Sequence, residues 1–387
     1  MSVRKRTWKA PNGEMKEAWV VDYVDQHGDR HIKTFARKRD ADAHHAIVGV
    51  AVRAGTHTAD SKSATVAKAA ELWLASCDAA GLERTTITAY RQHVDLHIVP
   101  ILGALRLTQL TVPLIRGFED RLRQDGRSPA MVRKARRSLG ALLADAQERG
   151  LVGQNVVRSL YTRRRSRRTE SNGKLKVGVD IPSPDEIRAI IAHLSGRWRP
   201  LLLTAIFTGL RASELRGLRW DDVDFKRREL HVRQRADRHG KIGRPKSDAG
   251  ERTVPLPPLV LSVLREHRLA CANGELGLAF PNSKGGIDHR NSIVERGFHP
   301  AQVAAGVVTA DGRAKYGGLH ALRHFYASWC INRRADGGLE LPLKLVQARL
   351  GHASIQMTAD QYGHLFPSGD DGAELAAAEK ALLRPIG

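Results

Sequence analysis

Residues 208–220 read Thr-Gly-Leu-Arg-Ala-Ser-Glu-Leu-Arg-Gly-Leu-Arg-Trp, and the interpretation of the last part of the chain depends on them. The apolar residues 201–208 predict a buried helix that breaks at Gly209. Arg211 would then be held between two rigid elements, with Glu214 three residues further on within reach of its guanidinium. A purely structural Arg–Glu pair has the same spacing, so this stretch alone does not establish a function.

Two later segments carry residues of related chemistry. The segment Leu-His-Ala-Leu-Arg-His contains His320 and Arg323, which would share one face of a helix. The segment Leu-Gly-His-Ala-Ser contains His352, and Tyr362 follows ten residues later. Any one such histidine or tyrosine is more often a structural residue than a catalyst, so the combination carries the argument.

Together these residue types fit attack on a DNA phosphodiester. Two guanidiniums can stabilise the charge on the non-bridging oxygens with planar, bidentate geometry. A tyrosine phenol can form a covalent phosphoenzyme, assisted by a general base and by a general acid for the leaving 5′ oxygen. A free phenol has a pKa of about 10, and neighbouring arginines favour its anion.

The order and spacing of these motifs over residues 181–366 resemble the tyrosine recombinases, or lambda-integrase family. The shared pattern is Thr-Gly-Leu-Arg-x-x-Glu-Leu, then His-x-Leu-Arg-His, then Leu-Gly-His, then Tyr. The resemblance implies a mainly helical catalytic domain with a small sheet and neither a metal nor another cofactor. It assigns six catalytic positions: Arg211, Lys246, His320, Arg323, His352 and Tyr362.

The resemblance also implies a role for each position. Arg211 and Arg323 would clamp the scissile phosphate, and Tyr362 would be the nucleophile. His320 and His352 would complete the phosphate pocket, and His320 is also a candidate base. Two other tyrosines, at positions 316 and 326, could compete for the role of nucleophile, but neither follows Leu-Gly-His.

The lysine of the family lies in a β-hairpin and protonates the leaving oxygen. Lys246, ahead of the segment Arg-Thr-Val-Pro-Leu, matches it best, and Lys241 is the alternative. Relatives often carry an acidic residue where this chain has Ala321, so a contact in the pocket is expected to differ. No P-loop, metal-ligand cluster or pair of metal-binding carboxylates is evident in the sequence.

Composition favours a polyanionic partner. The chain has 63 Lys and Arg against 41 Asp and Glu, a formal charge of +22 over 387 residues, and such a field attracts nucleic acid or an anionic membrane. The longest apolar run, residues 201–207, is too short to span a bilayer, and no apolar stretch of a signal peptide follows the basic N-terminus. Three widely spaced cysteines fit reduced thiols in a cytoplasmic protein.

We expect a multidomain, mainly α-helical chain. Residues 1–60 predict a β-rich unit, with a hairpin around Asp25-Gln26-His27-Gly28 and a short helix after it. Residues 64–160 predict helices, of which the clearest begins at Ser-Pro, residues 128–129, and ends at Gly150. The arginine-rich residues 161–180 predict a linker, and residues 181–387 a catalytic domain.

The resemblance extends to these units with less specificity. Residues 64–160 resemble a helical, SAM-like core-type DNA-binding domain, and residues 1–60 an arm-type DNA-binding domain. It implies double-stranded DNA attachment sites as partner, a homotetramer on two DNA sites and, as an open question, an excision-directionality factor. Two alternatives remain: a catalytically inactive DNA-binding regulator, and a type IB topoisomerase-like enzyme without strand exchange.

Overall fold

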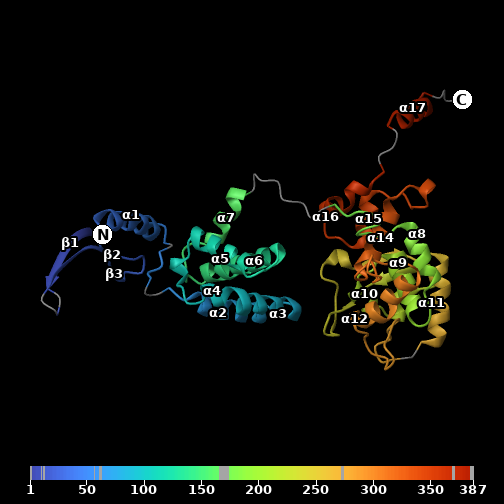
Figure 1. Cartoon of the computed structure of the whole chain (residues 1–387), viewed down its shortest axis with the longest axis horizontal. Coiled ribbons are helices and arrows are strands. Elements are labelled where there is room, and N and C mark those ends of the chain that lie inside the picture. The colour runs from blue at the N-terminus through green and yellow to red at the C-terminus, as the bar shows by residue number, and fades with distance from the viewer. Residues whose placement is uncertain are drawn as a thin grey trace. The chain divides into compact units, whose positions relative to one another are not determined.

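The chain folds into two compact units, residues 1–169 and 170–387 (Figure 1). The architecture is multidomain and mainly helical, as the sequence predicts. All three cysteines are unpaired thiols. The computed structural model describes these residues: 2–9, 11, 14–55, 57–60, 63–164, 174–271, 274–367 and 371–383.

The first unit begins with an antiparallel sheet of order β1-β2-β3, against which one helix packs. The predicted hairpin is confirmed as β2 and β3, because apolar residues alternate along β2 and place Val21 and Tyr23 in the core. Strand β1 was not predicted, since its polar, basic residues show no such alternation. The elements are β1 (Ser2–Lys9), β2 (Met15–Val24), β3 (Arg30–Phe35) and α1 (Lys38–Arg53).

The rest of this unit is helical and has a core of its own. The helix predicted to begin at residue 129 is confirmed, because the Ser128 hydroxyl accepts a hydrogen bond from the backbone of Met131 at 3.2 Å and Gly150 takes a left-handed φ of +71° after it. The helices are α2 (Val66–Ala79), α3 (Arg84–His93), α4 (Val99–Leu102), α5 (Val112–Gln124), α6 (Pro129–Glu148) and α7 (Val156–Arg164).

Pro100 does not interrupt the helical path of the chain. A π-helical turn, Val94–Ile98, joins α3 to α4, and Pro100 lies at the start of α4. Proline is tolerated there because the first turn of a helix leaves its backbone N–H groups without intrahelical acceptors. The chain therefore bends without breaking.

In the second unit, helices surround one hydrophobic core, and short strands form two small sheets. A capping box begins the first helix of this unit, with both hydrogen bonds between Ser183 and Glu186 present. The strands are β4 (Val223–Asp224), β5 (Glu229–Val232) and β8 (Arg252–Pro255) in one sheet, and β6 (Arg235–Ala236) and β7 (Ile242–Gly243) in the other. The helices are α8 (Pro184–Ala192), α9 (Trp198–Thr208), α10 (Ala212–Gly217), α11 (Pro258–Ala270), α12 (Arg290–Ile293), α13 (His299–Ala304), α14 (His320–Ile331), α15 (Leu343–Leu350), α16 (Ile355–Tyr362) and α17 (Asp371–Leu382).

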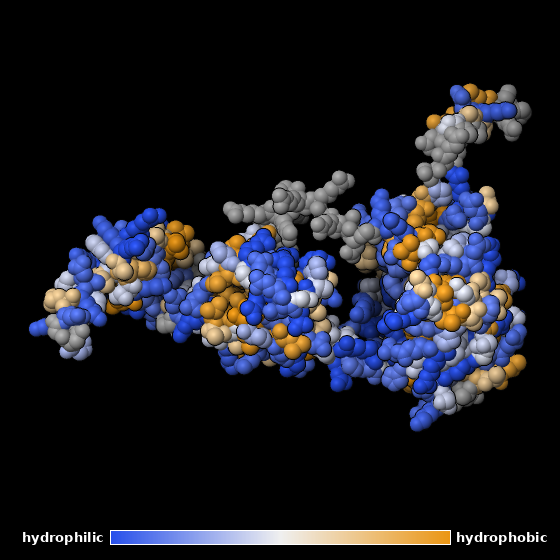
Figure 2. All heavy atoms as spheres, viewed as in Figure 1, coloured by the Kyte–Doolittle hydropathy of each residue, from blue (hydrophilic) through white to orange (hydrophobic). Residues whose placement is uncertain are grey.

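Hydrophilic residues cover most of the visible surface of both units (Figure 2). Within the described residues, no helix is long and apolar enough to cross a membrane. Of the predicted linker, residues 161–164 continue α7, whereas residues 165–173 lie outside the described part of the chain.

Candidate active site

Arg211 is fixed at the junction of two helices. Helix α9 ends at Gly209, whose φ of +62° turns the chain, and Arg211 is the N-cap residue of α10. Its guanidinium bonds Glu214 at 2.7 Å and the carbonyl oxygen of Gly351 at 3.1 Å. The backbone N–H of Arg211 also donates to Glu214, at 2.8 Å. The predicted Arg–Glu pair therefore exists, and a third, distant segment completes it.

Backbone carbonyl oxygens hold the guanidinium of Arg323 in place. Its side chain is 1% exposed, and its two terminal nitrogens donate to Gly209 at 2.7 Å and to Leu350 at 2.6 Å. These acceptors are at the C-terminal ends of α9 and α15, where helix carbonyls lack partners and the helix dipole favours a cation. Burial and the neighbouring Arg211 lower the pKa of Arg323 to about 9, which leaves it charged at neutral pH.

A glycine makes each of these helix ends possible. Gly351 ends α15 with a φ of +64°, as Gly209 ends α9. A Cβ atom at Gly209 would lie 2.4 Å from the Tyr326 ring, and one at Gly351 would lie 2.8 Å from the carbonyl oxygen of Ala249. The glycines of the Thr-Gly-Leu-Arg and Leu-Gly-His motifs are thus needed to bring the carbonyls to the two arginines.

Arg252 belongs to the same cluster, and the sequence analysis missed it. Its guanidinium forms a double hydrogen bond with Glu214, at 2.8 and 3.2 Å, and also donates to the carbonyl oxygen of Arg349 at 2.7 Å. Glu214 is 2% exposed. Burial opposes its ionisation, but Arg252 and Arg211 more than offset this and hold the pKa of Glu214 at about 2.

The predicted histidines lie beside this cluster. His352 is buried and shares a 2.9 Å hydrogen bond between its Nδ1 and the Thr358 hydroxyl. Burial, Arg323 and Arg211 lower the pKa of His352 to about 4, so its ring is neutral at pH 7. His320 begins α14 and is more exposed. Partial loss of water around its ring and the nearby Arg323 and Arg211 also lower the pKa of His320.

Tyr362 lies at the end of α16 with no exposed surface. Its phenol oxygen is 2.7 Å from Nδ1 of His324, a residue that the sequence analysis quoted but did not assign to the site. The His352 ring is parallel to the phenol, with centroids 6.3 Å apart. Burial raises the pKa of Tyr362 to about 12, against the opposing effect of Arg323 and Arg211.

Both candidate lysines are exposed and lie between β6 and β8. Lys241 is in the turn of the β6–β7 hairpin, and Lys246 is in the loop after β7. That loop reaches the cluster, because Ala249 within it approaches Gly351. The arrangement favours Lys246 without deciding between the two.

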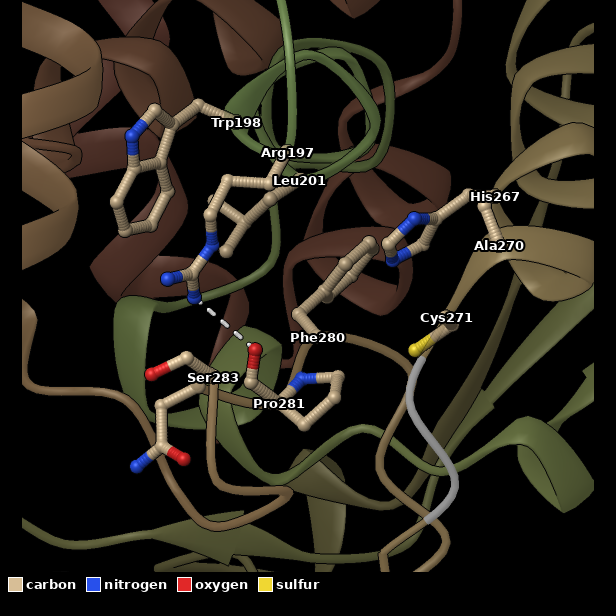
Figure 3. A pocket seen from close by; sticks show the side chains of 10 residues that line it. Arg197, Trp198, Leu201, His267, Ala270, Cys271, Phe280, Pro281 and Ser283 are labelled. Atoms are coloured by element: carbon tan, nitrogen blue, oxygen red, sulfur yellow. Dashed lines mark hydrogen bonds between the residues drawn. The ribbon is translucent and has the colours of Figure 1, made fainter.

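The apolar pocket in Figure 3 is a separate feature, lined by none of the six predicted site residues. In it, Trp198 and Phe280 lie beside Arg197, which donates to the carbonyl oxygen of Pro281 at 3.0 Å. In the described part of the chain, no group of three or more His, Cys, Asp and Glu side chains is arranged to hold a metal ion.

The geometry is that of a phosphoryl-transfer site: two fixed guanidiniums, neutral imidazoles and a phenol in one cluster. Tyrosine recombinases are enzymes that cleave and rejoin DNA strands. Residues 183–368, just under half of the chain, match the phage integrase family.

Relatives match along most of the chain. The XerC-like tyrosine recombinase of Caldanaerobacter subterraneus subsp. tengcongensis is 26% identical over 392 aligned positions, 94% of this chain and 96% of its own length. The integrase of Mycobacterium phage L5 is 26% identical over 68% of this chain and 71% of its own length.

Two solved structures have the same fold. The Tn1549 transposon integrase in complex with a circular intermediate DNA has a TM-score of 0.62 and 18% identity, covering 82% of this chain and all of that one. A lambda integrase tetramer bound to a Holliday junction has a TM-score of 0.55 and 16% identity, covering 90% and 95%.

Proposed function

We propose that this protein is a site-specific integrase, which inserts or excises a phage or another mobile element through a 3′-phosphotyrosine intermediate at Tyr362. The observation that supports this best is the joint anchoring of Arg211 and Arg323. Both donate to carbonyls at the end of α15, from Leu350 and Gly351, within the helix pair that also carries the phenol. Two rigid cations beside a phenol suit a pentavalent phosphate transition state.

The proposed step balances as follows. As the phenol oxygen of Tyr362 forms a bond to phosphorus, its proton passes to a general base, and the bond from phosphorus to the 5′ oxygen breaks. Arg211 and Arg323 stabilise the charge on the non-bridging oxygens, and Lys246 protonates the leaving oxygen. His320 and His352 complete the pocket. Because the phosphotyrosine retains the energy of the phosphodiester, the 5′ hydroxyl of another strand can reverse the step.

The other units would bind DNA. Residues 1–60 would contact arm-type sites and residues 64–160 core-type sites. The net charge of +22 over the whole chain would make DNA binding salt-dependent. Strand exchange requires four cut strands to be held together, which supports a tetramer on two sites. The lambda integrase tetramer on a Holliday junction supports the same assembly here by its fold.

A nicked suicide substrate tests the nucleophile. The wild-type protein should form a protein–DNA adduct that survives denaturing electrophoresis, in EDTA as well as in magnesium. Tyr362→Phe removes only the hydroxyl, so this variant should bind DNA and form no adduct.

An adduct in the Phe variant would place the nucleophile elsewhere, and strict dependence on magnesium would indicate a metal nuclease. An adduct without exchange between two sites would favour the topoisomerase-like alternative. DNA binding with no adduct from the wild type would favour the inactive regulator.

A further inference from the structure

The phenol of Tyr362 must lose a proton when its oxygen attacks phosphorus, and a histidine nitrogen that could accept this proton is in contact with it. Nδ1 of His324 lies 2.7 Å from the phenol oxygen. His324 is half-buried on α14, one residue after Arg323. The acceptor is therefore carried by the helix that also carries an arginine of the phosphate clamp.

The other two histidines of the site are less well placed for this role. His352 uses its Nδ1 in a 2.9 Å hydrogen bond with Thr358, and its ring is parallel to that of Tyr362 with centroids 6.3 Å apart. His320 stacks edge-on against His324, with ring centroids 4.6 Å apart. His324 in turn contacts the Tyr362 ring, with centroids 5.7 Å apart, so His324 is in contact with both His320 and Tyr362.

The protonation states of both groups allow the phenol to donate a hydrogen bond to His324. Partial burial, then His320 and Arg323, lower the pKa of His324 to about 4, while Asp180 opposes them. The imidazole is therefore neutral at pH 7 and has one nitrogen able to accept. The phenol is protonated, since the pKa of Tyr362 is raised to about 12. In the tautomer that carries its proton on Nε2, His324 accepts at Nδ1 and the phenol donates.

We propose that His324, and not His320, takes the proton of the Tyr362 phenol during DNA cleavage and returns it during rejoining. This rests on the proposed function, in which Tyr362 is the nucleophile. As the phenol oxygen bonds to phosphorus, its proton moves to Nδ1 of His324, and the leaving 5′ oxygen takes a proton from Lys246. The incoming phosphate brings negative charge near the imidazole, which favours its protonated form.

His324→Asn separates proton acceptance from hydrogen bonding. The amide oxygen of asparagine can still accept a hydrogen bond from the phenol but does not bind a proton at working pH. We expect adduct formation on the suicide substrate to slow by about 10²- to 10⁴-fold at pH 7. The logarithm of the rate should then rise by one per pH unit from pH 6 to 9, because hydroxide must remove the proton, whereas the wild-type rate should stay nearly level above pH 7.

Two controls isolate the step. A 5′-bridging phosphorothiolate substrate has a leaving thiolate that needs no acid, so it should restore cleavage to a Lys246→Ala variant and not to His324→Asn. His364→Asn is a matched histidine loss two residues beyond Tyr362, where His364 is half-buried and bonds the Leu175 carbonyl oxygen at 2.8 Å. It should keep the wild-type rate and pH profile.

His324→Ala with added imidazole covers the case in which the asparagine variant folds poorly. Adduct formation should increase in proportion to neutral imidazole, which a structural defect would not reproduce. The proposal would be overturned if the cleavage rate of His324→Asn stayed level above pH 7, as in the wild type, while the logarithm of the rate of His320→Asn rose by one per pH unit. His320 would then be the base. An adduct that persists in Tyr362→Phe would instead overturn the proposed function itself.

Discussion

Glu214 is the residue whose loss should damage the site most, because it joins two arginines at once. It accepts hydrogen bonds from the side chains of Arg211 and Arg252 and from the backbone of Arg211. Glu214→Gln keeps the size of the side chain and one oxygen acceptor but removes the negative charge. The variant would leave the largely buried Arg252 guanidinium, which is 5% exposed, without its counter-charge.

The expected loss of folding stability follows from the pKa of Glu214. Folding lowers it from 4.5 to about 2, and at about 1.4 kcal/mol per unit this corresponds to about 3 kcal/mol of stability. Removal of one partner of a buried ion pair costs about 3–5 kcal/mol, which agrees. Because the folded pKa is the lower one, this stability is fully present above about pH 4.5 and is lost as the pH falls toward 2.

Urea unfolding at pH 7 and pH 3 measures the difference in stability between Glu214→Gln and the wild type. Hydrogen exchange at pH 7 shows which helices lose protection. The variant should be less stable by about 3 kcal/mol at pH 7 and by about half of that at pH 3, with weaker protection in α9 and α14. Because Arg211 loses its fixed orientation, adduct formation should fall by about 10²-fold or more.

Glu119→Gln is the matched control. Glu119 is 1% exposed in the first unit and pairs with Arg116, Arg123 and Arg136. Its loss should weaken protection of α5 and α6 and leave adduct formation from bound DNA unchanged. Equal stability of Glu214→Gln and wild type at pH 7, or a difference that does not shrink at pH 3, would refute the reasoning.

Three further outcomes are expected. Arg211→Lys keeps the charge but not the planar fork, so adduct formation should fall by orders of magnitude while DNA binding, measured by gel shift, barely changes. Gly209→Ala would force a Cβ to within 2.4 Å of the Tyr326 ring, and should lower the melting temperature and slow cleavage by moving the carbonyl that Arg323 bonds. Folding lowers the pKa of His352 from its ordinary value of 6.5 to about 4. The wild type should therefore become less stable to urea as the pH falls from 6.5 to 4, and His352→Gln should lose less stability over that range.

The sequence predicted the parts of the site that depend on neighbouring residues. The Arg211–Glu214 pair spans three positions, and the helix end at Gly209 follows from the glycine after an apolar run. Arg252 could not be identified in this way. It meets Glu214 across 38 positions, and it does so because β8 packs beside α15.

His324 illustrates the same limit more sharply. The motif His-x-Leu-Arg-His displayed it, but its contact with Tyr362 again spans 38 positions and requires α16 to pack on α15. Likewise, the polar strand β1 has no alternation that would predict it, because its register is set by pairing with β2. Local sequence patterns therefore predicted which residue types form the site, whereas tertiary packing determines which of them contact one another.

The balance of charge and burial around Tyr362 bears on when the enzyme can cut. Arg211 and Arg323 favour a phenolate, but burial outweighs them and raises the pKa of the phenol to about 12. The fully buried oxygen cannot touch a phosphate until α16 or its surroundings move. The free protein thus holds the proposed nucleophile protonated and inaccessible, beside two arginines that are already fixed in place. If DNA binding provides both the movement and the phosphate charge, cleavage is confined to assembled complexes.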